Sequence, residues 1–128
     1  MISSKPGKQR ARFYQAPLHA KRKQIAGHLS KELRAKYKKR SFPIRKGDEV
    51  KIVRGDFKGK SGKVTKIDCG KMIAYVEGIS RKKVSGTEKQ IPLRASNMII
   101  INLILDDKKR IAALKRGKEK AKGEQSGQ

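Results

Sequence analysis

Residues 46–64 read KGDEVKIVRGDFKGKSGKV, and this stretch decides the expected fold. Val50 and Ile52 recur with a period of two, and a second β-branched run begins at Val64. A basic, glycine-rich segment separates the two runs. Short β-branched runs bounded by glycine-rich turns are typical of paired strands. The stretch therefore predicts a strand, a tight turn and a second strand.

Further short apolar runs follow toward the C-terminus, at residues 72–76, 91–93 and 98–101. Five such strands over residues 44–105 predict a mainly β fold, as a small barrel or sandwich. Closure of the five strands would also remove exposed sheet edges. Residues 81–90 are polar and basic, with a Ser85-Gly86 turn signal, and are expected to form a loop or hairpin tip.

The charge of the chain is concentrated before this β region. The 128 residues carry 35 Lys or Arg against 11 Asp or Glu, for a formal net charge of +24. Residues 1–46 hold fifteen of these cations and one acid, Glu32. A small domain with this charge repels itself unless a polyanion neutralises it. Nucleic acid is the expected partner, because its phosphates are a dense source of fixed negative charge.

The segments outside the β region are expected to be short and partly helical. Residues 1–12 predict an extended arm, and a helix is expected from Pro17 to Gly27, with Leu18, Ile25 and Leu29 as its apolar stripe. Ser30 is expected to cap a second helix, in which Leu33 and Tyr37 dock on the core. After Leu105, Asp106 is expected to cap a short helix that ends at Gly117.

Three parts follow from this pattern. Residues 1–43 form a basic extension with two short helices, ending at Pro43, which cannot continue a helix. Residues 44–105 form the β domain. Residues 106–128 form a short helix and a polar tail, which is expected to be disordered without a partner.

Residues 46–64 resemble a KOW motif, a strand–loop–strand unit of SH3-like barrels in ribosomal proteins and transcription elongation factors. Residues 16–23 (APLHAKRK), 29–37 (LSKELRAKY), 40–50 (RSFPIRKGDEV) and 92–98 (PLRASNM) narrow the match. Together they resemble the archaeal and eukaryotic form of the twenty-fourth universal protein family of the large ribosomal subunit. The resemblance extends from about residue 8 to about residue 116.

This resemblance implies a five-stranded SH3-like barrel with a basic helical N-terminal extension and a short C-terminal helix. It implies a cytoplasmic, ribosomal protein that binds large-subunit rRNA early in assembly, near the 5′ region of that RNA. It also implies a place beside the exit of the peptide tunnel, among neighbouring ribosomal proteins. Two rivals remain at this point: a KOW-type transcription factor and a DNA-compacting basic protein.

Catalytic and metal sites are not expected. Gly59-Lys60-Ser61 is superficially similar to a phosphate-binding loop, but Arg54 replaces its first glycine and a strand pattern follows. Asp48 and Glu49 are adjacent, so they point to opposite faces of a strand, and Asp48 is expected to support a turn or pair with a neighbouring cation. No cysteine–histidine cluster surrounds Cys69. No enzyme activity, cofactor, metal, small-molecule substrate or membrane span is therefore expected.

The candidate RNA contacts are cations that occur in clusters outside the apolar runs, since Lys and Arg neutralise phosphates and Arg can bridge two of them. His19, beside three cations, is either an RNA contact or an exposed bystander, and Phe13-Tyr14 can stack on a base. The predicted contact residues are Lys5, Lys8, Arg10, Arg12, His19, Lys21, Arg22, Lys23, Arg34, Lys38, Lys39, Arg40, Arg45, Arg54, Lys58, Lys60, Lys63, Arg81, Lys82, Lys83 and Arg94.

Overall fold

The stretch that decides the fold forms two antiparallel strands, as predicted, with Val50 opposite Gly62. Gly55 and Gly59 in the connecting loop have φ angles of +95° and +89°, a region that side chains with a Cβ rarely adopt. Gly62 serves a different purpose, because a Cβ there would lie 2.6 Å from the Glu77 carbonyl oxygen. Glycine therefore permits both the turn and the close approach of the neighbouring chain.

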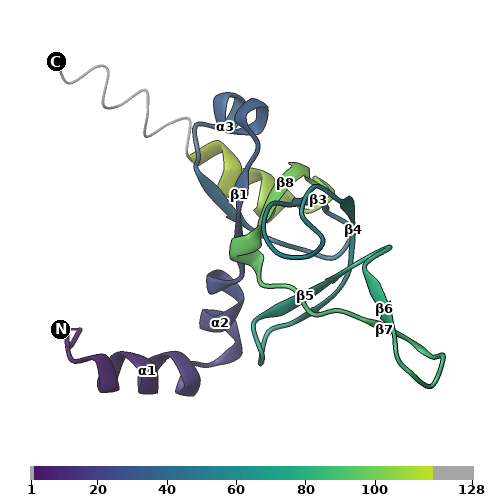
Figure 1. Ribbon diagram of the computed structural model, residues 1–128. Coiled ribbons are helices and arrows are strands. Elements are labelled where there is room, and N and C mark those ends of the chain that lie inside the picture. Colours follow the sequence, from purple (N-terminus) through teal and green to yellow (C-terminus); the bar gives the residue numbers. More distant parts are fainter. Residues whose placement is uncertain (1, 117–128) are drawn as a thin grey trace, which may run out of the picture.

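The computed structural model describes residues 2–116, in which helix and strand are about equally represented. Figure 1 shows a sheet with a separate hairpin at one end and helices at the other. Residues 108–116 form a last helix, called here the C-terminal helix. The preceding elements are α1 (Pro6–Gln15), α2 (Leu18–Gln24), β1 (Ala26–Leu29), α3 (Lys31–Tyr37), β2 (Ser41–Pro43), β3 (Glu49–Ile52), β4 (Ser61–Asp68), β5 (Ile73–Val76), β6 (Ser80–Lys82), β7 (Glu88–Gln90), the 3-10 turn η1 (Ala95–Asn97) and β8 (Met98–Asn102).

The main sheet has six strands in the order β2-β1-β8-β3-β4-β5, and β1 runs parallel to β8. The expected strand at residues 91–93 is reduced to one bridge, between Leu93 and Ala74 of β5. Two strands from the segment that ends at Pro43 join the sheet instead. The sheet is thus mixed and larger than predicted, and its closure into a five-stranded barrel stays a prediction.

The prediction that this helix continues to Gly27 was wrong, because α2 ends at Gln24 and the chain becomes extended. Ile25, Gly27 and Leu29 are all buried, at a spacing of two residues. A Cβ at Gly27 would lie 3.1 Å from the Ile44 side chain, so glycine lets β1 approach the core closely. Ile25 and Leu29, which were expected on one face of a helix, thus lie in or next to a strand.

The main sheet contains strands from both sides of Pro43. The domain boundary expected at Pro43 stays a prediction.

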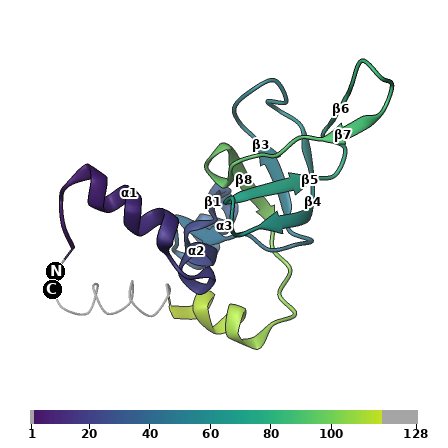
Figure 2. The ribbon, with the colours of Figure 1, turned by 90° about the horizontal axis from the view of Figure 1, so that it is seen from below.

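The extended arm predicted for residues 1–12 was also wrong. Residues Pro6–Gln15 form α1, with Pro6 in its first turn, where a missing N–H costs nothing. Gln9, Arg10, Ala11 and Arg12 are good helix formers. No residue of α1 is buried, and Figures 1 and 2 both show the helix extending away from the sheet.

The second helix is confirmed as α3. The Ser30 hydroxyl accepts a hydrogen bond from the Leu33 backbone N–H at 3.4 Å, which caps the first turn. Tyr37 is buried and Leu33 packs against the core. The expected hairpin is confirmed too: β6 and β7 pair antiparallel around the Ser85-Gly86 turn, and residues 80–90 are all exposed.

The C-terminal helix begins one residue later than predicted, since Asp107 rather than Asp106 accepts the Lys109 backbone N–H, at 2.9 Å. Leu114 anchors the helix in the core and is 1% exposed. The expected end at Gly117 and the expected disordered tail lie outside the described residues.

A buried ion pair holds this helix against the turn that precedes β3. Arg110 donates two hydrogen bonds to the Asp48 carboxylate, at 2.8 and 2.5 Å, and the side chains are 3% and 0% exposed. Asp48 also accepts the Arg45 backbone N–H at 2.9 Å. Both expected roles of Asp48, in a turn and in an ion pair, are confirmed. Its cation comes from 62 residues away in the chain.

Candidate nucleic-acid interface

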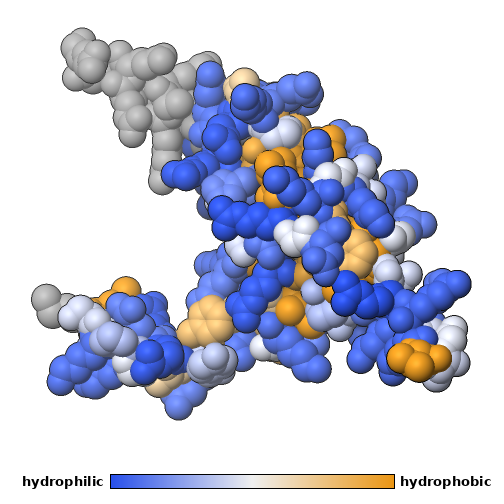
Figure 3. All heavy atoms as spheres, viewed as in Figure 1, coloured by the Kyte–Doolittle hydropathy of each residue, from blue (hydrophilic) through white to orange (hydrophobic). Residues whose placement is uncertain are grey.

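The predicted contact residues lie at the surface. Lys21, Lys39 and Arg45 are half-buried, and the other predicted residues are exposed. Figure 3 shows hydrophilic residues over most of the face in view, with smaller hydrophobic patches between them. Most of these cations lie in three parts of the molecule: α1, the neighbourhood of α2 and the C-terminal helix, and the β3–β4 loop with the β6–β7 hairpin. Figures 1 and 2 show the hairpin at the opposite end of the molecule from these helices.

The first set lies on and just before α1 and contains Lys5, Lys8, Arg10 and Arg12, all exposed. The Phe13 and Tyr14 rings meet edge to face with centroids 5.4 Å apart, and Tyr14 is 72% exposed. A helix with no buried face, several cations and an open aromatic ring suits binding to a phosphate backbone with stacking on a base.

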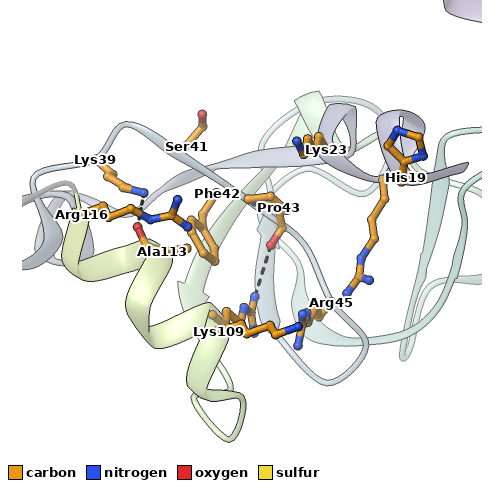
Figure 4. A pocket seen from close by; sticks show the side chains of 12 residues that line it. His19, Lys23, Lys39, Ser41, Phe42, Pro43, Arg45, Lys109, Ala113 and Arg116 are labelled. Atoms are coloured by element: carbon orange, nitrogen blue, oxygen red, sulfur yellow. Dashed lines mark hydrogen bonds between the residues drawn. The ribbon is translucent and has the colours of Figure 1, made fainter. Parts of the chain in front are cut away.

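The second group lines a cavity of about 660 Å³ between α2, β2 and the C-terminal helix, called here the basic groove. Figure 4 shows side chains from these three elements around the same space. Five predicted residues belong to it: His19, Arg22, Lys23, Lys39 and Arg45. The remaining lining residues are Ser41, Phe42, Pro43, Lys109, Arg110, Ala113 and Arg116.

Sequence reasoning missed the contribution of the C-terminal helix to this groove. Lys109, Ala113 and Arg116 are spaced at i, i+4 and i+7, which places them on one helical face. Arg110 and Leu114 share the neighbouring, buried face. The spacing of these residues indicates that they share one helical face. No local pattern in the sequence indicates that this face turns toward α2.

Three cations of the groove already have partners. Arg45 forms an ion pair with Asp107 at 2.7 Å, and this hydrogen bond, with that from the Lys109 backbone N–H, lowers the pKa of Asp107 below its usual value. Lys39 donates to the Ala113 carbonyl oxygen. Arg110 donates to the Pro43 carbonyl oxygen at 3.2 Å, in addition to its bonds to Asp48. These contacts tie the groove's floor and one wall together.

The last group lies at the far end of the sheet, on the β3–β4 loop and the β6–β7 hairpin. Arg81 of the hairpin pairs with Asp56 of the loop at 2.8 Å, so the two projections are linked. Both side chains are more than half exposed, so the pair adds little stability. The predicted contact residues at this end, including one near the start of β4, are Arg54, Lys58, Lys60, Lys63, Arg81, Lys82 and Lys83.

Five predicted residues join neither the α1 set, the groove nor this end. Lys21 lies on α2 but does not line the groove. Arg34 and Lys38 lie on or next to α3, Arg40 precedes β2, and Arg94 precedes η1. Gly59-Lys60-Ser61 leads into β4 and not into a helix, which removes the similarity to a phosphate-binding loop.

Between residues 2 and 116, no helix is long and apolar enough to cross a membrane. Within the same range, no group of three or more His, Cys, Asp or Glu residues is placed to hold a metal ion.

The comparisons with known proteins agree with one another. A family model that describes the eukaryotic ribosomal proteins L26 and their archaeal counterparts matches residues 3–117. The chain belongs to this family. The large ribosomal subunit protein uL24 of Methanosphaera stadtmanae is 43% identical to it over 115 residues, which is 90% of this chain and 98% of that protein. The resemblance noted in the sequence is confirmed.

Membership in this ribosomal protein family makes the chain a structural component of the cytoplasmic ribosome and not an enzyme. The family match includes α1, both walls of the basic groove and the hairpin. The family match therefore covers the helices and the hairpin that carry these cations, and not only the KOW-like strands.

Proposed function

We propose that the chain is a component of the large ribosomal subunit that binds rRNA through its basic surface. One observation carries this proposal: α1 and the residue before it project from the fold with four exposed cations and no buried residue. A helix without an apolar face gains nothing from standing alone in water. Contact with RNA phosphates would give it a partner.

The folded sheet and the extension have separate tasks in this proposal. The sheet supplies a rigid body, with the β3–β4 loop and the hairpin at one end. The helices α1 and α2 reach outward from the other end and neutralise phosphates of rRNA. A protein of this shape holds together RNA segments that lie far apart.

The family resemblance extends the proposal to early binding near the 5′ region of the large-subunit rRNA and to a site beside the peptide tunnel exit. The relative's name, as a large ribosomal subunit protein, supports the choice of subunit. Order-of-addition assembly, with and without the chain, tests the timing, since omission should block later proteins.

The test of RNA binding replaces Lys5, Lys8, Arg10 and Arg12 with alanine. Alanine favours helix, so α1 should persist. Affinity for large-subunit rRNA should fall, and the slope of log affinity against log salt should decrease by about 3, at about 0.7–0.9 for each lost phosphate contact.

A matched control removes four other exposed cations, Lys31, Lys51, Lys66 and Lys71. It should change the slope by clearly less. Equal effects of the two variants would refute a specific role of α1. Stronger binding to duplex DNA than to rRNA would favour the DNA-compacting rival and contradict the proposal.

A further inference from the structure

The basic groove brings cations of α2 and of the C-terminal helix to the same cavity, and the net charge of the chain alone does not explain this arrangement. We propose that it binds the sugar–phosphate backbone of a single RNA strand, with α2 as one wall and the C-terminal helix as the other. This inference rests on the proposed rRNA binding and adds a site, since Lys109 and Arg116 are new contact residues.

Charge is the first argument for an anionic occupant. No Asp or Glu is among the residues that line the groove. The side chains of Arg22 and Lys23 on one wall, and of Lys109 and Arg116 on the other, make no hydrogen bond or ion pair with any residue from 2 to 116. Cations that face each other across a shared cavity repel, and phosphate between them relieves that repulsion.

Rigidity is the second argument. The Lys39 ammonium bonds to the Ala113 carbonyl oxygen, as a dashed line in Figure 4 shows. Arg110 bonds to the Pro43 carbonyl oxygen. Arg110 is in turn fixed by buried Asp48. The C-terminal helix is thus held at its position before any ligand arrives, and a preformed site loses less entropy on binding.

The floor and the size of the groove decide which form of RNA fits. Phe42 and Pro43 form an apolar floor, and the Phe42 ring is backed by Lys39 and Arg110 at 5.5 and 5.4 Å. The Phe42 residue is only 6% exposed, so it offers van der Waals contact to a sugar and no open face for a base. A volume of about 660 Å³ is in the range of sites for small ligands, about 300–1,000 Å³, so the groove has room for a short stretch of one strand's backbone.

The C-terminal helix offers a matched pair of variants. Lys109→Ala with Arg116→Ala removes two cations from the groove, whereas Lys108→Ala with Lys115→Ala removes two exposed cations of the same helix that do not line it. Both variants have the same net charge and a similar helix propensity. For the full chain with large-subunit rRNA, the first should lower the salt slope by about 1.4–1.8, and the second by less than half of that.

The opposite wall gives a second variant. Arg22→Ala with Lys23→Ala should reproduce the loss, and the four substitutions together should about double it. If the substitutions at Lys109 and Arg116 lower the melting temperature, the Arg22 and Lys23 variant tests RNA binding in the groove instead. Equal slopes for groove and control variants, or a loss on one wall only, would overturn the proposal.

Two controls separate the remaining outcomes. Inorganic phosphate and adenosine monophosphate, added to the free protein at constant ionic strength, test the groove as a site for free phosphate. A larger rise in the melting temperature of the wild type than of the Lys109 and Arg116 variant, with equal salt slopes of the two for rRNA, would identify a site for free phosphate and overturn the RNA assignment. If the wild type fails to bind rRNA at all, the proposed function fails, and the groove's role in it fails as well.

Discussion

Residues 2–24 and residues 25–43 carry a similar density of cations, seven in the first segment and six in the second, yet the fold treats them in opposite ways. No residue of the first segment is buried. The second supplies β1, β2 and four apolar core residues: Ile25, Leu29, Tyr37 and Phe42. Charge density therefore does not tell which segment belongs to the fold, whereas the spacing of a few apolar residues does.

The same comparison bears on the boundary expected at Pro43. Lys and Arg side chains extend from strands and short helices into solvent while the backbone beneath them pairs in a sheet. A basic run is consequently compatible with a projecting helix and with an integrated strand. The two segments can be separated by experiment.

The largest effect should come from deletion. A chain lacking residues 2–24 should still unfold cooperatively, because it loses no buried side chain, but its rRNA affinity should fall. A chain lacking residues 2–43 should lose cooperative unfolding. Burial of each of the four core side chains contributes about 1.5–3 kcal/mol, and together they rival a total stability of about 5–15 kcal/mol.

Thermal unfolding followed by circular dichroism measures both deletions. A cooperative transition in the shorter chain would show that the chain from residue 44 onward forms a domain by itself. Residues 25–43 would then not be required for the fold, and the contrast with residues 2–24 would be wrong.

Arg110→Ala should destabilise the fold by about 3–5 kcal/mol, because it leaves the Asp48 carboxylate buried without its cation. Arg110 also bonds to Pro43, the last residue of the integrated segment, so the loss should loosen β2. Urea unfolding measures the change.

An apolar replacement of both partners, Asp48→Leu with Arg110→Met, is the matched control. It removes the pair without leaving a buried charge and should recover much of the stability. If Arg110→Ala costs less than about 1 kcal/mol, water reaches Asp48 and the pair does not anchor the helix.

Two leucines test the comparison one side chain at a time. Leu29 is 1% exposed and Leu18 is 67% exposed. Leu29→Ala should cost about 2–5 kcal/mol, and Leu18→Ala should stay within about 0.5 kcal/mol. Similar values for both would mean that α2 packs on the sheet more tightly than its exposure indicates.

The smallest effect concerns pH. The Arg45 side chain and the Lys109 backbone N–H bind the Asp107 carboxylate and lower its pKa in the folded state. The stability that this carboxylate contributes is present above its unfolded pKa, about 4, and is lost as the pH falls through the lower folded value. Asp107→Asn should therefore be less stable than wild type near neutral pH.

The difference between Asp107→Asn and wild type should shrink in acid, once the carboxyl group is protonated in both states. Urea midpoints at neutral and acidic pH give the comparison. A difference that persists at low pH would come from helix capping by residue 107 and not from its charge.

Several elements were predictable because their causes are local. The strand–turn–strand unit at residues 46–64 follows from β-branched alternation and two glycines that adopt positive φ. The cap at Ser30 and the hairpin turn at Ser85-Gly86 likewise depend on residues within a few positions of each other. The predicted contact residues lie at the surface because cations avoid a core.

The sequence by itself thus determined the family and the paired strands around residue 55, and it indicated a polyanionic partner, since these depend on composition and on neighbours in the chain. Only the tertiary structure decided that β1 lies parallel to β8, that Arg110 neutralises Asp48, and that α2 and the C-terminal helix face each other across one groove. Those partners are more than 60 residues apart in the chain, and no local spacing specifies which distant segment meets another. The packing of the whole core makes that choice.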